Sequence, residues 1–250
     1  MREPDPRRAR TFGARAEDYE RWRPSYPPDA VAWLVPPDAA RVADVGAGTG
    51  KLTGPLLALG LEVVAVEPDP DMLAVLRREH PAAVPYLAGA DALPIPDASV
   101  DAVLAGQAWH GFPHERTVAE VRRVLRPGGW LGLVWNGPDP REVWEYDLAR
   151  LDPDTSGRDF LADPADEPFE VDGLPPDHLE WATFRWLWAT DGASLAGRLR
   201  THSGLAVMPA DERERLIAAM VAVVTAEAER RGTPTVPQRH AAHCVRWRPV

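Results

Sequence analysis

The chain has 250 residues, of which 45% are hydrophobic, and it carries a formal net charge of −10 at neutral pH. That length and apolar content suit one α/β domain with room for an elaborated cap. No apolar run approaches the roughly 20 residues that cross a bilayer, and the chain does not begin with an apolar secretion signal. The only cysteine, Cys244, excludes an intrachain disulfide, so we expect a cytoplasmic protein that does not span a membrane.

Residues 1–36 precede the first predicted strand and are rich in aromatic and arginine side chains. Between positions 12 and 27 they read F-G-A-R-A-E-D-Y-E-R-W-R-P-S-Y-P. One interpretation is that Phe12, Tyr19 and Tyr26 only pack a helix against a sheet. The other is that part of this segment contacts a ligand.

Residues 42–50 read V-A-D-V-G-A-G-T-G, a short apolar strand that contains Asp44 and is followed by Gly46, Gly48 and Gly50. Glycines at alternate positions allow a sharp turn and a close approach of the backbone to a ligand. The turn lies where a strand meets a helix, which is where open α/β sheets bind nucleotide-like ligands. We therefore expect an adenosine-containing cofactor. The spacing fits neither the dinucleotide fingerprint nor the phosphate loop, which disfavours a nicotinamide oxidoreductase.

Residues 61–66 read as a buried parallel strand that ends at Glu67, with Pro68 and a helix start at Asp69 after it. A carboxylate at this strand tip can accept both hydrogen bonds of a ribose diol. The alternative is an acid in a solvated loop.

Three further strands are expected at 84–88, 99–105 and 130–135. Asp91 and Ala92 follow the first of them, and Gln107 and His110 follow the second. A helix end and a Pro-Gly-Gly turn, within 120–130, lead into the third.

The negative charge is concentrated between residues 139 and 180, which contain fourteen acidic residues and three arginines. Asp-Pro steps interrupt this segment, so we predict an irregular insertion with a short helix over 141–150. Such a surface repels phosphate backbones, and no basic stripe with interleaved aromatics is present elsewhere, so nucleic acid is not an expected partner. A solvated acidic surface is a simpler interpretation than a cation site.

The last seventy residues predict a strand over 179–188, helices over 194–202 and 210–231, and a final strand over 238–248. Trp181, Trp186 and Trp188 suit packing of core and cap. One or two of them lining a cavity would suit an apolar or planar substrate.

Several of these features occur in order over about 95 residues: the glycine turn, the acid after the second strand, Asp91 and the Pro-Gly-Gly block. In this order they resemble the core motifs of class I S-adenosylmethionine-dependent methyltransferases. The 12–27 segment resembles the F-G-x-x-A-x-x-Y-x-x-x-R-P-x-Y-P opening of a small-molecule branch, methyltransferase type 11 and trans-aconitate methyltransferase-like. Trp22 is a local variation between Arg21 and Arg23.

The resemblance implies an α/β fold: a Rossmann-like, seven-stranded mixed sheet with helices on both faces. It also implies a helical lid over 1–36, a cofactor-binding core over 37–137, the insertion over 138–180, and completing strands and helices over 181–250, all in one structural domain. The implied contacts with S-adenosylmethionine are made by Tyr19, Arg23, Asp44, Gly46, Gly48, Gly50, Glu67, Pro68, Asp91, Ala92 and Gln107. Among these, the Asp91 carboxylate would meet the adenine amino group, Tyr19 would face the methionine portion, and Arg23 would pair with a carboxylate.

The function that follows is methyl transfer to a small-molecule acceptor by in-line displacement, which positioning alone can accelerate. His110 is the candidate base or orienting group, and a structural role for it is an open alternative. Gly111 and Pro113 argue against a zinc site made with His114, and no metal is expected. A non-catalytic cofactor-binding or partner-binding module on the same fold is the second hypothesis. The sequence names neither the acceptor atom nor the state of assembly, monomer or homodimer.

Overall fold

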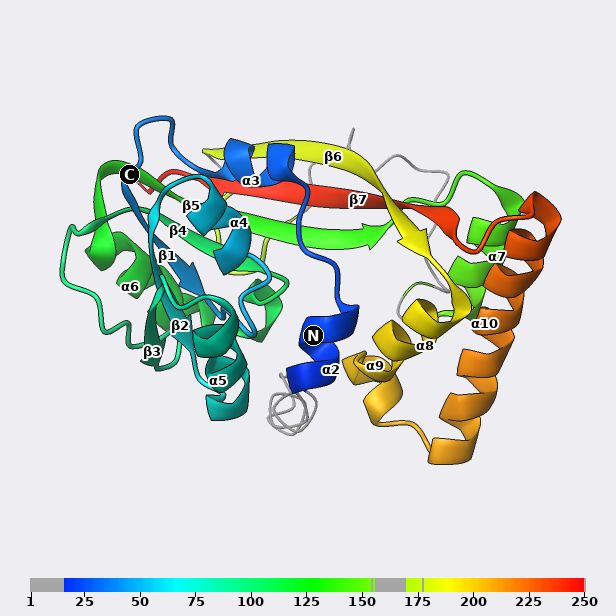
Figure 1. Ribbon diagram of the computed structural model, residues 1–250. Helices are drawn as coiled ribbons and strands as arrows, with labels where there is room; N and C mark the ends of the chain where they lie inside the picture. The colour runs from blue at the N-terminus through cyan, green and yellow to red at the C-terminus, as the bar shows by residue number, and fades with distance from the viewer. Residues whose placement is uncertain (1–15, 154, 156–169, 177, 250) are drawn as a thin grey trace.

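The computed structural model describes residues 16–153, 155, 170–176 and 178–249 (Figure 1). Phe12, at the predicted opening, and residues 156–169 of the predicted insertion lie outside the described residues. The strands are β1 Arg41–Val45, β2 Glu62–Glu67, β3 Val84–Leu87, β4 Val100–Gly106, β5 Leu125–Pro138, β6 Leu179–Thr190 and β7 Val236–Trp247. The helices are α2 Ala16–Trp22, α3 Pro28–Leu34, α4 Thr53–Ala58, α5 Pro70–Glu79, the 3₁₀ turn η1 Trp109–Gly111, α6 His114–Val124, α7 Val143–Leu151, α8 Gly192–Arg200, α9 Ser203–Ala206 and α10 Ala210–Arg231.

As expected, these strands form one mixed sheet of seven; the structure gives their order as β3-β2-β1-β4-β5-β7-β6. Strands β1 to β5 are parallel to their neighbours, and β7 is antiparallel to both β5 and β6. Strands β2 and β3 lie on one side of β1, and β4 and β5 lie on its other side. In a parallel sheet such a switch point opens a crevice at the carboxyl ends of the strands.

Helices cover both faces of the sheet because its strands are apolar on both sides. On one face, Val42 and Val63 pack with Leu34 of α3 and Leu56 of α4. On the other face, Val45, Val66 and Val103 pack with Val121 and Val124 of α6. Burial on both faces explains why the central strands read as continuous apolar runs and not as alternating ones.

A second apolar core lies at the far end of the long strands (Figure 1). Trp144 of α7, Leu195 and Leu199 of α8, and Ile217 and Met220 of α10 pack there with Val236. Helix α10 covers the predicted range and ends at Gly232, whose φ of 68° gives the left-handed helix end that glycine favours. This helical layer is the cap that faces the carboxyl edge of the sheet.

Helix α2 bridges the core and the cap (Figure 1). Glu17 pairs with Arg78 of α5, and a Cβ on Gly197 of α8 would lie 2.3 Å from the Trp22 ring. The Trp22 indole therefore lies so close to α8 that a side chain at position 197 would force it to move. No helix among the described residues is both long and apolar enough to cross a membrane.

Candidate active site

The glycine turn joins β1 to the segment before α4, and its three glycines have positive φ angles of 68°, 57° and 99°. A Cβ on Gly46 would lie 2.6 Å from the Ala108 Cβ, and one on Gly50 would lie 2.2 Å from the His80 ring. A Cβ on Gly48 would meet nothing within 4 Å. Packing therefore requires a glycine at position 46, and a side chain at position 50 would displace the His80 ring. Gly48 presents bare backbone to open space.

Asp44 lies beneath this turn and is fully buried. One carboxylate oxygen, Oδ2, accepts a hydrogen bond from the Thr53 hydroxyl at 2.6 Å. The other, Oδ1, is buried without a hydrogen-bond partner among the described residues. Burial raises the pKa of Asp44 to about 7. An unmet buried acceptor is costly, and the negative charge of ionised Asp44 beneath the turn favours a positively charged group above it.

Glu67 ends β2 and is tied to the same turn. Its Oε2 accepts the Gly48 N–H at 2.8 Å, and its Oε1 accepts the Asp69 N–H at 2.9 Å. Burial raises the pKa of the Glu67 carboxyl above its usual range. Asp69, just after Pro68, caps α5 through the N–H groups of Asp71 and Met72. Each carboxylate oxygen has a further lone pair that can accept a ligand hydroxyl.

The loops after β3 and β4 complete this edge of the sheet. Asp91 faces Arg116 at 3.7 Å, and the Ala92 N–H makes only a long, 3.4 Å hydrogen bond to Gly89. Gln107 has a φ of 58°, a backbone conformation that is uncommon for residues other than glycine. Its amide donates to the carbonyl of Asn136 at 2.9 Å.

A cavity of about 500 Å³ lies between this edge and the cap. Of the residues predicted from the sequence, Tyr19, Arg23, Gln107 and His110 line it. The other predicted residues, from the glycine turn and the ends of β2 and β3, are outside its lining. Lys51 joins the two groups because it follows Gly50 directly and also lines the cavity.

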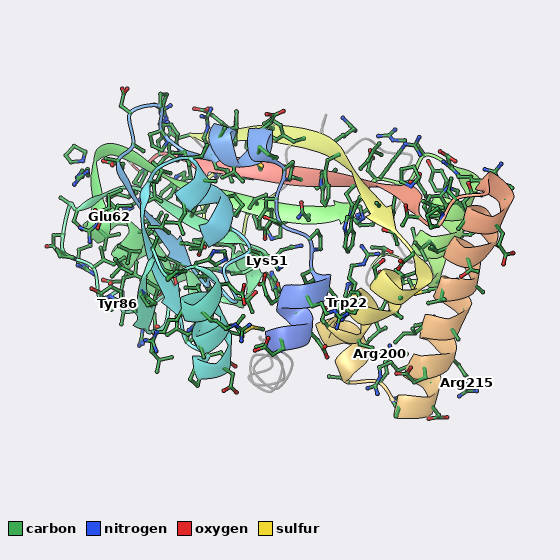
Figure 2. The ribbon with its side chains drawn as sticks, in the orientation of Figure 1. Trp22, Lys51, Glu62, Tyr86, Arg200 and Arg215 are labelled. Atoms are coloured by element: carbon green, nitrogen blue, oxygen red, sulfur yellow. The ribbon has the colours of Figure 1, made fainter. Side chains whose placement is uncertain are left out.

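Helix α2 and the residues after it close one side of the cavity. The Lys51 ammonium pairs with the Glu20 carboxylate at 2.8 Å and also donates to the Glu20 carbonyl (labelled Lys51 in Figure 2). Arg23 lies over the Tyr19 ring, 5.3 Å from its centroid. The Arg23 side chain also donates to the hydroxyl and the carbonyl of Thr201, just after α8. The expected lid segment thus touches both the sheet edge and the cap.

His110 is on the 3₁₀ turn after β4, and its side chain is exposed at the cavity. His114 lies elsewhere: its Nε2 is 3.0 Å from the Trp109 carbonyl, and its ring stacks on Trp109. Among the described residues, no group of three histidine, cysteine or acidic side chains is placed to hold a metal ion.

The sequence interpretation missed the cap side of the cavity. Arg198 of α8, His202, and Gln238, Arg239 and His240 of β7 all line it. Each is one polar residue in an ordinary helix or strand pattern. The folding of β7 beside β5 brings Gln238, Arg239 and His240 to the cavity, whereas Arg198 and His202 come from α8 and the residues just after it.

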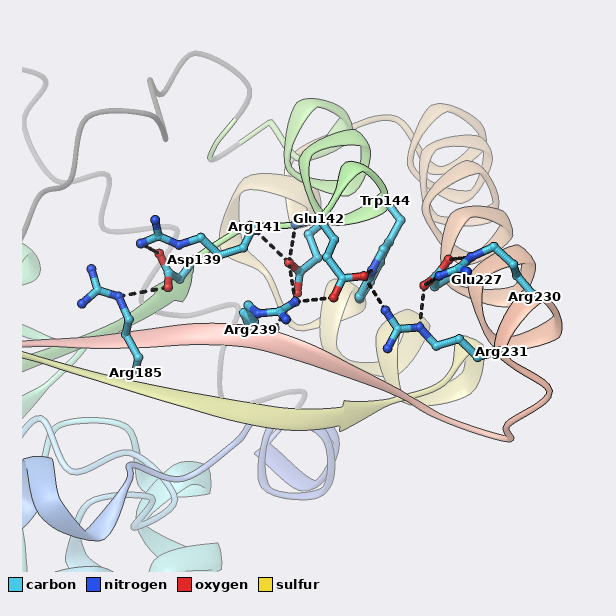
Figure 3. A network of polar contacts seen from close by, with 10 residues as sticks. Asp139, Arg141, Glu142, Trp144, Arg185, Glu227, Arg230, Arg231 and Arg239 are labelled. Atoms are coloured by element: carbon cyan, nitrogen blue, oxygen red, sulfur yellow. Dashed lines mark hydrogen bonds and ion pairs between the residues drawn. The ribbon is translucent and has the colours of Figure 1, made fainter.

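Close to the cavity, an ion-pair network fixes α7 against β7 (Figure 3). The Glu142 carboxylate binds Arg239 at 2.7 Å and also pairs with Arg231 of α10. Glu145, which is 3% exposed, accepts the backbone N–H groups of Arg141, Glu142 and Arg239.

A methyltransferase domain model matches residues 43–133. An uncharacterized methyltransferase of Mycobacterium tuberculosis (strain ATCC 25618 / H37Rv) is 48% identical over 180 residues, which cover 70% of this chain and 71% of that protein. A solved structure from Anaeromyxobacter dehalogenans, described as a candidate type II methyltransferase, has a TM-score of 0.59 and 26% identity. The alignment covers 90% of this chain and 96% of that one.

A second structure, a candidate methyltransferase from an antibiotic biosynthesis pathway of Anabaena variabilis ATCC 29413, has a TM-score of 0.55 and 23% identity over 86% of this chain and 95% of that one. This match is a match of fold alone. Together with the strand order and the glycine turn, the sequence match to the mycobacterial protein settles the family. The chain belongs to the class I S-adenosylmethionine-dependent methyltransferases.

Proposed function

We propose that this methyltransferase transfers the methyl group of S-adenosylmethionine to a small-molecule acceptor that binds in the cavity beside the glycine turn. The observation that carries the proposal is the cavity itself, because its volume of about 500 Å³ is in the range of small-ligand sites. The cap, the segment after α2 and the sheet edge all contribute to its lining.

The described residues fit the cofactor at two points. The open space beside Gly48 allows the amino-acid end to approach the backbone. The carboxylate of Asp44, buried beneath the turn, suits a positively charged ammonium above it. We assign the ribose hydroxyls to Glu67, with Pro68 beside it, and the adenine to Asp91 and the Ala92 N–H. Tyr19, Arg23 and Gln107 are assigned to the methionine end, where Arg23 would pair with the carboxylate.

When bound, the cofactor supplies an electrophilic methyl group on a sulfonium. The protein's task is then to align the acceptor and to exclude water, which can contribute several kcal/mol to a reduced barrier. His110 lines the cavity from the sheet edge. It is placed to accept a proton from a hydroxyl or amine acceptor, or to orient a carboxylate that needs no base.

Two measurements test the proposal. Calorimetry should show that the protein binds S-adenosylmethionine and S-adenosylhomocysteine. Incubation with methyl-labelled S-adenosylmethionine and a bacterial metabolite extract should transfer label to molecules that pass a small-pore filter. A protein that binds the cofactor but labels no metabolite would instead be a binding module, and one that binds neither compound would contradict the site assignment.

A further inference from the structure

The cavity is positively charged although the chain as a whole is acidic. Among the described residues, its lining contains the cations Arg23, Lys51, Arg198 and Arg239 and the carboxylates Glu145 and Asp152. The whole chain carries a net charge of −10. A local excess of one sign inside a cleft concentrates ligands of the opposite sign.

Two of these cations are already neutralised. Lys51 pairs with Glu20 at 2.8 Å. Arg239 pairs with Glu142 at 2.7 Å and with Glu145 at 3.2 Å. The charges of Lys51 and Arg239 are therefore balanced by carboxylates of the protein itself.

Arg198 differs because its contacts are all with uncharged groups. Its Nη1 lies 3.4 Å from His240 Nε2, its Nη2 donates to Gln238 Oε1 at 3.3 Å, and its Cζ lies 5.0 Å from the Trp188 ring centroid. Its Nε has no hydrogen-bond partner among the described residues. Of the five N–H donors of a guanidinium, most are unused, and the two bonds that form are long.

The neighbours of Arg198 orient it without neutralising it. Burial lowers the pKa of His240 to about 3, so its ring is uncharged at neutral pH. Burial and the charge of Arg23 lower the pKa of Arg198 to about 10, which still leaves it cationic. No described carboxylate forms an ion pair with it, and Asp152 acts on it only through a more distant charge. A cation inside a protein that forms no direct ion pair is costly, which points to a ligand as its partner.

We propose that Arg198 holds a carboxylate of the methyl acceptor, so that the acceptor is a small organic acid. This inference rests on the proposed function. The planar guanidinium matches a carboxylate with two parallel hydrogen bonds. Because Arg198 comes from α8 of the cap, whereas Lys51 and Gln107 come from the sheet edge, the acid group faces the cap. The rest of the acceptor then extends towards the cofactor.

The test does not require the acceptor to be known. A metabolite extract is divided on an anion exchanger before the reaction, and each fraction is incubated with methyl-labelled S-adenosylmethionine. We expect the labelled products to come from the retained, anionic fraction, and we expect phosphatase treatment of that fraction to leave the yield unchanged. Label only from the unretained fraction, or loss of the yield after phosphatase treatment, would overturn the assignment of an organic acid.

Variants then test the role of Arg198 itself. With the retained fraction as substrate, Arg198→Gln should raise the apparent KM at least tenfold over that of the wild type. Arg198→Lys keeps the positive charge and should raise the apparent KM by less. The control is Arg200→Gln, because Arg200 is on the same helix but exposed and paired with Glu214 (Figure 2), and it should leave KM unchanged. An unchanged KM in Arg198→Gln would overturn the proposal.

The affinity of each variant for S-adenosylhomocysteine separates this inference from the proposed function. All variants should keep the wild-type affinity, within about twofold, if Arg198 serves only the acceptor. Should no fraction be labelled, binding of succinate and of neutral succinamide to the complex with S-adenosylhomocysteine decides the question. Stronger binding of succinate that is lost in Arg198→Gln supports the anion site, and equal binding of the two compounds refutes it.

Discussion

Gly48 is the residue at which the cofactor assignment can be separated from the demands of folding. Its φ of 57° strains any other residue, but a Cβ there meets no protein atom. Gly60 offers a matched control, because its φ of 82° is also positive and its Cβ would also meet nothing within 4 Å. Both positions therefore cost a comparable backbone strain, of order 1–3 kcal/mol, when they are replaced.

We expect Gly48→Ala and Gly60→Ala to lower the melting temperature by similar amounts. Only Gly48→Ala should also weaken the binding of S-adenosylhomocysteine, by about tenfold or more, which corresponds to roughly 1.4 kcal/mol. Isothermal titration calorimetry on the two folded variants measures this difference. Equal affinities would show that the cofactor does not approach the backbone at Gly48.

Asp44 predicts a pH dependence of cofactor binding. Its pKa of about 7 lies above the value of about 3.9 for an unfolded chain, so the folded apoprotein binds the extra proton. The free energy of unfolding of the apoprotein therefore falls as the pH rises from about 4 to 7, because Asp44 ionises less readily in the folded state than in the unfolded chain. A bound ammonium reverses this balance because it pairs with the ionised form.

The affinity for S-adenosylhomocysteine should accordingly rise about eightfold between pH 6 and pH 7.5, as the ionised fraction of a group with this pKa does. Asp44→Asn should bind more weakly and show no such rise. Calorimetry in buffers of different ionisation enthalpy should also detect proton release at pH 6. A wild-type affinity that is flat over this range would remove Asp44 from the ammonium site.

At the scale of elements, the placement of α7 depends on one buried acid. Glu145 is 3% exposed, accepts three backbone N–H groups, and lies 3.2 Å from Arg239. It forms the reciprocal capping pair with Glu142 at the start of α7. Removal of this carboxylate leaves several buried donors and a cation without their acceptor, and each unmet donor costs about 1–3 kcal/mol.

Glu145→Ala should therefore lower the free energy of unfolding by about 3–5 kcal/mol, as expected when one partner of a buried ion pair is removed. The control is Asp147→Ala on the same helix. Asp147 forms an exposed ion pair with Arg150 at 3.4 Å, and loss of such a pair should lower the free energy of unfolding by less than about 1 kcal/mol. Urea denaturation of both variants measures the difference. Comparable losses would show that the network in Figure 3 contributes no more than an exposed surface pair.

At the scale of the whole molecule, the parts that could be predicted from sequence are the local ones. The glycine turn directly follows the residues of β1, and Glu67 is the last residue of β2, so each is adjacent in the chain to the strand that positions it. The helix ending at Gly232 is equally local, because a glycine after an apolar periodic segment is a helix end signal. The fold class, a seven-stranded mixed sheet with helices on both faces, followed from these motifs through the family resemblance.

The cap side of the cavity could not be predicted in this way. Gln238 and His240 reach the cavity because β7 runs antiparallel to β5, and Arg198 reaches it because α8 places its side chain beside these two residues. Nothing within a few residues of Arg198 signals that its partners are uncharged. That property is set by which side chains fold around it, some of them 40 residues away.

The cavity thus combines three segments that are distant in sequence, and α2 connects them. Tyr19 and Arg23 face the cavity, Glu20 binds Lys51 of the core, and Arg23 binds Thr201 of the cap. If the cofactor contacts Tyr19 and Arg23, its binding energy will stabilise α2 against local opening. The same energy will stabilise α8, because Trp22 packs directly on Gly197.

Hydrogen exchange should therefore slow on binding of S-adenosylhomocysteine in three separate regions. These are the strand and turn over 42–50, helix α2, and the facing end of α8 up to Thr201. The carboxyl-terminal half of α10 packs away from these contacts and provides the internal control, with unchanged exchange. Protection confined to the turn and the end of β2 would mean that the cofactor binds the sheet edge alone and that α2 and the cap respond only to the acceptor.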